Sequence, residues 1–166
     1  MLLDFDHRVT GFASQPMRLF STAGRRRRSH APDWFARRAD GTGMVVDCRP
    51  LDRIKPRDAE AFAATERACR AIGWEFRLLG APDVVLLANV RWPAGYRHPR
   101  HRVGPVADRL LESFSRAKAL RDGAERVGDP IAVLPVVFHL LWSGRLVADL
   151  SPLLGEYTLV SRAEAP

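Results

Sequence analysis

Apolar and polar residues alternate along the first half of the chain in the manner of short strands. The pattern predicts a strand within residues 9–20, a second over residues 29–36 and a third over residues 43–49. Trp74, Phe76 and Leu78 alternate with their neighbours and predict a fourth strand. Turn-forming residues separate these runs, so each is expected to be a separate element.

Helical spacing of apolar residues begins after the third strand. Pro56 suits the first turn of a helix, and Gly73 is expected to end it. Asp83 can cap a second, short helix that ends at Pro93. The order strand, strand, strand, helix, strand, helix predicts an α/β core with a mixed sheet.

The second half of the chain is predicted to be mainly helical. Residues 95–104 are polar and contain proline, so a linker is expected there. Helices should follow over residues 106–117 and 129–142, where Pro135 can split the second into two. Two short strands are then expected, over residues 145–150 and 157–161. Helices followed by a terminal hairpin are typical of a winged-helix module, although other small α+β bundles share the pattern.

Two carboxylates stand where neighbouring strands are expected to meet. Asp33 belongs to the second predicted strand and Asp47 to the third, with residues 37–43 as a hairpin connection. Residues two apart in a strand share a face, so Arg49 should project with Asp47, and Cys48 should point the other way. Two anionic ligands beside one cation suit an oxygen-preferring divalent ion near a phosphate.

Simpler explanations remain open for the same residues. Asp33 can be a turn carboxylate at a strand end, and Asp47 with Arg49 can be a surface ion pair, because Asp-x-Arg is common by chance. His30 can contact a phosphate or cap the hairpin. Arg25, Arg26, Arg27 and Arg28 can be a solvated hairpin tip or a phosphate contact.

Charge and cysteine content narrow the functional class. The 166 residues carry a net charge of +7, which favours an anionic partner, nucleic acid above all. The two cysteines form neither a disulfide framework nor a zinc-ligand spacing, which predicts a reducing compartment. The start does not read as a signal peptide, and the longest apolar stretch is too short to span a bilayer. We therefore expect a cytoplasmic protein without a membrane partner.

Three parts of the chain resemble the PD-(D/E)xK nuclease superfamily, namely His30, Pro32–Phe35 and Val45–Arg49. The whole chain is similar, more closely, to the actinobacterial TnsA-like subunits of heteromeric transposases. Further supporting stretches are Leu2–Phe5, Ser14–Pro16, His139–Trp142 and Ala148–Leu150. The resemblance implies a restriction-endonuclease-like mixed sheet with flanking helices over residues 1–95. Its N-terminal helix is expected to be truncated, with Met1–Phe5 as the remaining tail. It implies a small winged-helix-like domain over residues 96–166.

The resemblance also implies an activity and its residues. TnsA-like subunits are endonucleases that cut transposon ends with Mg²⁺, or Mn²⁺, beside a DDE-type transposase and an ATP-dependent regulator. Asp33 matches the first metal-binding Asp, Asp47 stands at the second ligand, and the backbone carbonyl of Cys48 completes the set. Arg49 takes the position of the catalytic Lys, but it cannot act as a base because a guanidinium stays protonated in proteins. The family's further Glu, on a helix before the first strand, has no counterpart in this sequence.

Two main hypotheses follow. The chain is either a Mg²⁺-dependent endonuclease, or a truncated, catalytically inactive module that binds DNA and protein in a transposition complex. A plain winged-helix DNA-binding regulator is a third hypothesis. The outer face of the helix over 131–142 carries little charge, so residues 104–166 are expected to bind protein. DNA contact is expected mainly from residues 1–95, through Arg25–Arg28 and His30.

Overall fold

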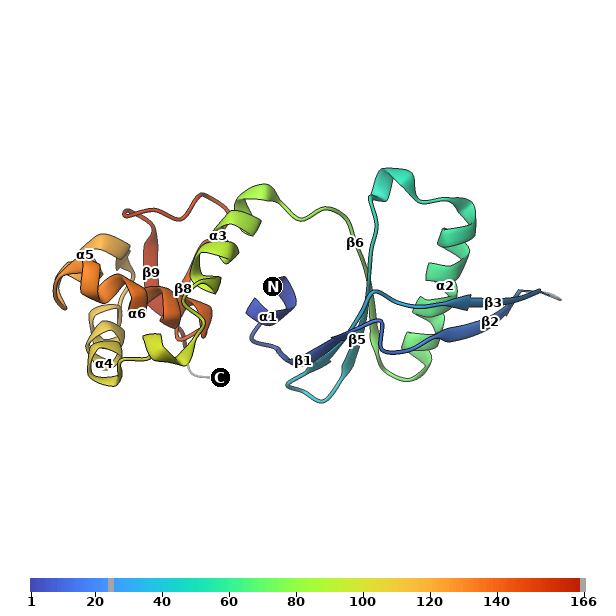
Figure 1. The fold of residues 1–166 in the computed structure, drawn as a ribbon, viewed down its shortest axis with the longest axis horizontal. Coiled ribbons are helices and arrows are strands. Elements are labelled where there is room, and N and C mark those ends of the chain that lie inside the picture. The colour runs from blue at the N-terminus through green and yellow to red at the C-terminus, as the bar shows by residue number, and fades with distance from the viewer. Residues whose placement is uncertain (24–25, 165–166) are drawn as a thin grey trace. The chain divides into compact units, whose positions relative to one another are not determined.

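The computed structural model describes residues 1–23 and 26–164, and its contacts group them into two compact units (Figure 1). The sheet unit is Asp6–Pro82, and the helical unit is Met1–Phe5 together with Asp83–Pro166. The chain is mixed α/β, with antiparallel and parallel strands in one sheet and flanking helices. In the described part of the chain, no helix has the length and apolarity needed to cross a membrane.

The sheet unit is built on four strands in the order β1-β4-β5-β6. They are β1 (Val9–Ser14), β4 (Trp34–Arg38), β5 (Gly43–Cys48) and β6 (Glu75–Leu79). Strand β4 runs antiparallel to both β1 and β5, whereas β5 and β6 are parallel. The central strand β5 is apolar over Met44–Val46 and buried from Gly43 to Asp47, as expected for a strand covered on both faces.

The connection from β5 to β6 passes through the 3-10 turn η1 (Leu51–Arg53) and helix α2 (Pro56–Ala71). A crossover of this length is what a parallel pair of strands requires. Helix α2 buries Phe62, Thr65 and Cys69, and the ring of Phe62 stacks on that of Phe76 in β6 with centroids 6.3 Å apart. The helix therefore covers one face of the sheet beside the end of β5.

A second, two-stranded sheet forms from β2 (Leu19–Ala23) and β3 (Arg26–His30), which pair antiparallel. The prediction of one strand over residues 29–36 is wrong, because β3 ends at His30 and β4 begins at Trp34. Pro32 lies in the break and has no N–H to donate to a strand partner. The break lets the chain pass from the two-stranded sheet into the four-stranded one.

The helical unit is organised around helix α6. Its elements are α1 (Leu2–Phe5), α3 (Val84–Ala94), η2 (Pro99–His101), α4 (Gly104–Ser113), β7 (Lys118–Ala119), α5 (Leu120–Glu125), α6 (Pro130–Trp142), β8 (Leu146–Ala148) and β9 (Leu159–Arg162). Residues 136–142 of α6 are all buried, together with side chains of α4, α5, β8 and β9. The short strands form an antiparallel sheet in the order β7-β9-β8.

Several details of the helical unit differ from the sequence-based expectation. Helix α3 packs on α6, so residues 83–95 group with this unit and not with the sheet unit, whereas the predicted boundary lay at residue 95. Pro135 does not split α6. The carbonyl left without its helical partner is that of Ile131, which is 85% exposed and can be hydrated. Strand β7 and helix α5 were not predicted.

Packing in the helical unit can be tested at Gly123 in α5. A Cβ atom here would overlap with Cε1 and Cζ of Phe114, which is fully buried. We expect Gly123→Ala to lower the free energy of unfolding by about 1–3 kcal/mol through overpacking, although Ala normally favours a helix over Gly. Urea unfolding followed by circular dichroism measures the change.

Gly128→Ala is the matched control, because its Cβ would meet only Cγ2 of Val133 at 3.4 Å, an ordinary contact. Equal stability of the two variants would contradict the close packing of Phe114 against α5.

Candidate active site

The antiparallel register of β4 and β5 brings Asp33 beside Asp47. Trp34 pairs with Val46, so the residue before Trp34 lies next to the residue after Val46. The backbone N–H of Asp33 donates a hydrogen bond to Oδ1 of Asp47 at 3.3 Å. The two predicted ligands therefore meet where β4 begins and β5 ends.

The carboxylate of Asp47 is enclosed. The residue is 0% exposed, and its Oδ2 lies 2.7 Å from Nε2 of His30 at the end of β3. The rings of His30 and of Phe62 in α2 form an edge-to-face pair, with centroids 5.6 Å apart. Both oxygens of Asp47 thus have a partner, as a buried carboxylate requires.

Asp33 and Arg49 form the more open half of the site. Oδ2 of Asp33 accepts hydrogen bonds from the Cys48 N–H at 2.8 Å and from Nη1 of Arg49 at 3.0 Å. Nη1 of Arg49 also donates to the Cys48 carbonyl at 2.7 Å. The side chains of Asp33 and Arg49 are 23% and 44% exposed, so this half is accessible from solvent.

The oxygen atoms of Asp33, Asp47 and the Cys48 carbonyl have the chemistry of ligands for a divalent ion. Two carboxylates and one carbonyl are the hard oxygen donors that Mg²⁺ and Mn²⁺ prefer. The Arg49 guanidinium contacts two of the predicted ligand atoms, Oδ2 of Asp33 and the Cys48 carbonyl, so positive charge is already favoured at this point. Among the described residues, no three His, Cys, Asp or Glu side chains gather as a metal-binding group. The donor set fits an ion that also takes water ligands, as Mg²⁺ usually does.

The environment of Cys48 reports the negative charge of the site. Burial raises the pKa of the Cys48 thiol most, the carboxylates of Asp33 and Asp47 raise it further, and Arg49 offsets part of the shift. The thiol is therefore a poor nucleophile at neutral pH, and no chemistry is assigned to it.

The predicted DNA-contacting residues fall on β3 and just before it. Arg25 lies outside the described residues, and Arg26, Arg27 and Arg28 pair through their backbones with Ala23, Thr22 and Ser21. Arg26–Arg28 are therefore residues of a paired strand and not the hairpin tip that was one of the two explanations left open for them. His30 is only 16% exposed in its side chain and is bonded to Asp47, so it supports the carboxylate. Sequence reasoning missed this partnership because no local spacing links two residues on different sheets.

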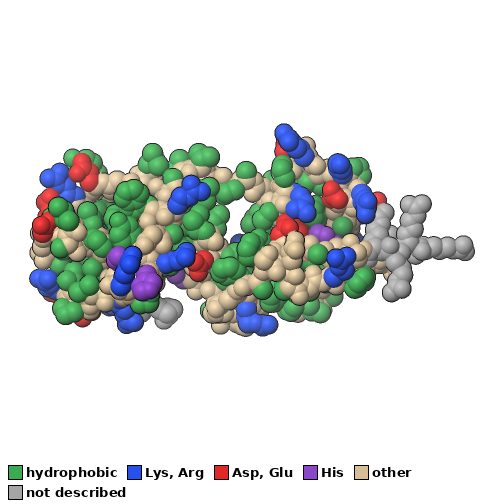
Figure 2. Space-filling view, in the orientation of Figure 1, with side chains coloured by type: hydrophobic (Ala, Val, Ile, Leu, Met, Phe, Trp, Pro, Cys, Tyr) green, Lys and Arg blue, Asp and Glu red, His purple; other side chains and the backbone are tan. Residues whose placement is uncertain are grey.

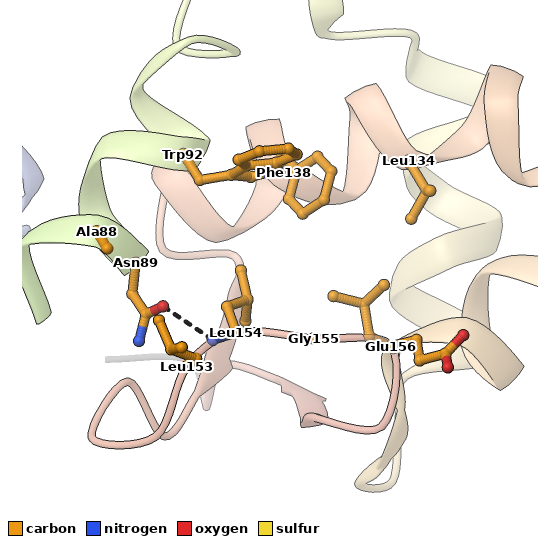
Figure 3. A pocket seen from close by; sticks show the side chains of 10 residues that line it. Ala88, Asn89, Trp92, Leu134, Phe138, Leu153, Leu154, Gly155 and Glu156 are labelled. Carbon is orange, nitrogen blue, oxygen red and sulfur yellow. Dashed lines mark hydrogen bonds between the residues drawn. The ribbon is translucent and has the colours of Figure 1, made fainter. Parts of the chain in front are cut away.

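The helical unit holds a separate apolar pocket of about 330 Å³ (Figure 3). It is lined by Ala88, Asn89, Trp92, Leu120, Leu134, Phe138, Leu153, Leu154, Gly155 and Glu156. Asn89 shapes it, since its Nδ2 donates to the carbonyls of Leu150 and Pro152 and its Oδ1 accepts from the Leu154 N–H at 2.8 Å. The pocket wall is therefore held in place by hydrogen bonds.

Comparison with known proteins assigns no family to the chain and no function to this site. A scan against protein-family models gives no match, and a search of curated proteins gives none either.

The electrostatics of the site can be tested at Cys48. We expect its alkylation by iodoacetamide to have a pH midpoint above the ordinary thiol value, because desolvation and two carboxylates disfavour the thiolate. Asp33→Asn should move the midpoint to lower pH by removing one of these charges. Peptide-resolved mass spectrometry separates Cys48 from Cys69, which is buried. An unchanged midpoint in Asp33→Asn would contradict the described proximity of Asp33.

Proposed function

We propose that this chain is a TnsA-like endonuclease subunit of a heteromeric transposase, which cleaves DNA strands at transposon ends with Mg²⁺ or Mn²⁺. One observation carries the proposal: Asp33, Asp47, the Cys48 carbonyl and Arg49 converge where β4 and β5 meet. These are the positions to which the resemblance to PD-(D/E)xK nucleases assigns metal ligands and the catalytic cation.

The architecture supports the same proposal. A mixed sheet with a helical crossover between its parallel strands agrees with a restriction-endonuclease-like unit. Helices followed by the antiparallel strands β8 and β9 agree with a winged-helix-like unit. The net charge of +7, with Lys and Arg side chains on both units in Figure 2, favours DNA as the partner.

Each residue of the site has a separate role in the proposed reaction. Asp33, Asp47 and the Cys48 carbonyl would hold the ion, and His30 would keep Asp47 oriented. When bound, the ion supplies a Lewis acid at the scissile phosphate and a water of lowered pKa. Arg49 would stabilise the charge that develops on the phosphate oxygens, and it takes no part in proton transfer because it stays protonated.

Arg49 would exchange partners during metal binding. Its guanidinium holds Oδ2 of Asp33 and the Cys48 carbonyl, which are two of the proposed ligand atoms. For these oxygens to hold an ion, the Arg49 guanidinium would move away from them. It would remain beside the site, in reach of a bound phosphate.

Protein partners are proposed for the helical unit, namely the transposase and the ATP-dependent regulator that the resemblance implies. The pocket in Figure 3 suits an apolar side chain, and Trp92 and Leu153 on its rim are 60% and 67% exposed. Exposed large apolar side chains around a concave surface are typical of protein interaction sites.

A non-catalytic module that binds DNA and protein is the second candidate. It is favoured by the hydrogen bonds within the site, since Asp47 and Oδ2 of Asp33 are already satisfied by groups of the chain. These oxygens therefore need no ion to satisfy them. Cleavage and metal binding therefore decide between the two candidates.

Strand cleavage should depend on Asp33 and Asp47. With the element's transposase and regulator, DNA carrying the transposon ends and Mg²⁺ or Mn²⁺, we expect Asp33→Asn and Asp47→Asn each to lower cleavage at least ~100-fold, because each removes a charged ligand. Asp52→Asn is the control, since Asp52 is an exposed carboxylate of the same unit, 76% exposed in its side chain. Gel analysis of end-labelled DNA measures the rate.

Equal cleavage rates in the Asp33→Asn and Asp52→Asn variants would show that the site takes no part in the reaction. Absence of cleavage by the wild-type chain with its partners would instead favour the non-catalytic module.

Arg49→Ala should change metal binding and cleavage in opposite directions. Removing the guanidinium frees two ligand oxygens, so Mn²⁺ affinity measured by calorimetry is expected to rise about two- to fivefold, the size of a partly exposed ion pair. Cleavage should fall, because the cation that stabilises the phosphate is lost. Asp33→Ala/Asp47→Ala should abolish Mn²⁺ binding. If Arg49→Ala leaves the affinity unchanged, the guanidinium and the ion do not share ligands.

A further inference from the structure

A basic groove of about 540 Å³ lies in the helical unit. Four cationic side chains line it: Arg109 of α4, Arg116 in the loop after α4, Lys118 of β7 and Arg126 at the end of α5. The remaining lining residues are Glu112, Ser113, Ser115 and Val127. The groove therefore carries a clear excess of positive charge.

The four cations of this groove have no anionic partner within the described part of the chain. Other arginines do, as shown by Arg121, which lies 2.7 Å from Glu125 and 3.3 Å from Glu156. Like charges gathered at one place repel one another, and an anion bound among them offsets that repulsion.

The core holds the groove in shape. The backbone of Lys118 pairs with Val160 of β9, and the N–H of Arg162 donates to the Phe114 carbonyl at 2.8 Å. The Ser113 hydroxyl donates to the Gly123 carbonyl at 2.9 Å, which ties the end of α4 to α5. The loop that carries Arg116 is thus fixed at both ends.

A structural explanation covers only part of this pattern. A cation near a helix C-terminus is stabilised by the helix dipole, which accounts for Arg126 at the end of α5. It does not account for Arg109 in the body of α4 or for Lys118 in β7. The convergence of charges from three elements needs another cause.

We propose that this groove binds the phosphate backbone of DNA, so that the helical unit contacts DNA through α4, β7 and α5. Arginine and lysine side chains, together with serine hydroxyls such as that of Ser115, are groups that contact phosphate oxygens in protein–DNA complexes. None of the described residues that line the groove is Asn or Gln, so the contact should position the duplex without reading its sequence. This deepens the proposed function and rests on it. It departs from the expectation that residues 104–166 bind protein and that DNA contact falls mainly to residues 1–95.

The test compares two triple variants of the full chain that lose the same charge. The groove variant is Arg109→Gln/Arg116→Gln/Arg126→Gln, and the control is Arg91→Gln/Arg97→Gln/Arg145→Gln, which changes exposed arginines elsewhere in the same unit. Fluorescence anisotropy with a labelled duplex is measured over a range of NaCl concentrations. EDTA is present, so binding is observed independently of metal and cleavage.

The groove variant should lose about three units of the slope of log K against log salt, roughly one for each phosphate contact, and the control should lose less than one. Equal slopes in the two variants would overturn the proposal. Glu112→Gln adds a gain of function that misfolding cannot produce, because it removes a carboxylate from the groove and should tighten DNA binding. Unchanged or weaker binding by Glu112→Gln would count against the groove.

Labelled polyglutamate distinguishes DNA from an acidic protein partner. If the groove variant keeps the wild-type slope on DNA but loses polyglutamate binding, the groove serves an acidic protein and the proposal is wrong. Loss of DNA binding by the groove variant, with cleavage residues intact, supports it whether or not the chain cuts DNA.

Discussion

Burial of the Asp47 carboxylate constrains the whole sheet unit. A carboxylate without exposed surface is costly unless hydrogen bonds replace its water, and here His30 and the Asp33 backbone supply them. These partners come from the end of β3 and from the residue before β4, so one side chain ties three segments of the chain together. Loss of the His30 or the Asp33 hydrogen bond would leave the buried Asp47 carboxylate partly unsatisfied, at a cost in stability. The positions of both partners are therefore tightly constrained.

The ion pair between Asp33 and Arg49 differs from the buried Asp47 carboxylate in its exposure to solvent. Their ion pair is partly exposed, and such pairs contribute little to stability, so they can separate at small cost. A rigid, buried carboxylate beside an exchangeable, accessible one is a suitable arrangement for taking up an ion and a phosphate together. The same arrangement explains why a network that is complete without metal remains compatible with a metal-dependent function.

Local patterns predicted many of the elements, and the wrong or missing predictions have a physical cause. The apolar run of β5, the helix that begins at Pro56 and the adjacency of Asp33 and Asp47 follow from periodicity and from a hairpin of known length. The bond between His30 and Asp47, and the packing of α3 on α6, were not predictable because they join residues far apart in sequence. The basic groove was missed for the same reason, since its cations come from three elements whose packing no spacing reveals.

The central claim is that Asp33, Asp47 and the Cys48 carbonyl hold a divalent ion, and affinity cleavage with iron tests it most directly. Fe²⁺ in place of Mg²⁺ generates hydroxyl radicals with ascorbate and peroxide, which cut the polypeptide beside the ion. We predict backbone cuts near residue 33 and residues 47–49 of the wild-type chain, suppressed by excess Mg²⁺ and absent from Asp33→Ala/Asp47→Ala. Cuts that fall elsewhere, or that persist unchanged in the double variant, would contradict the account.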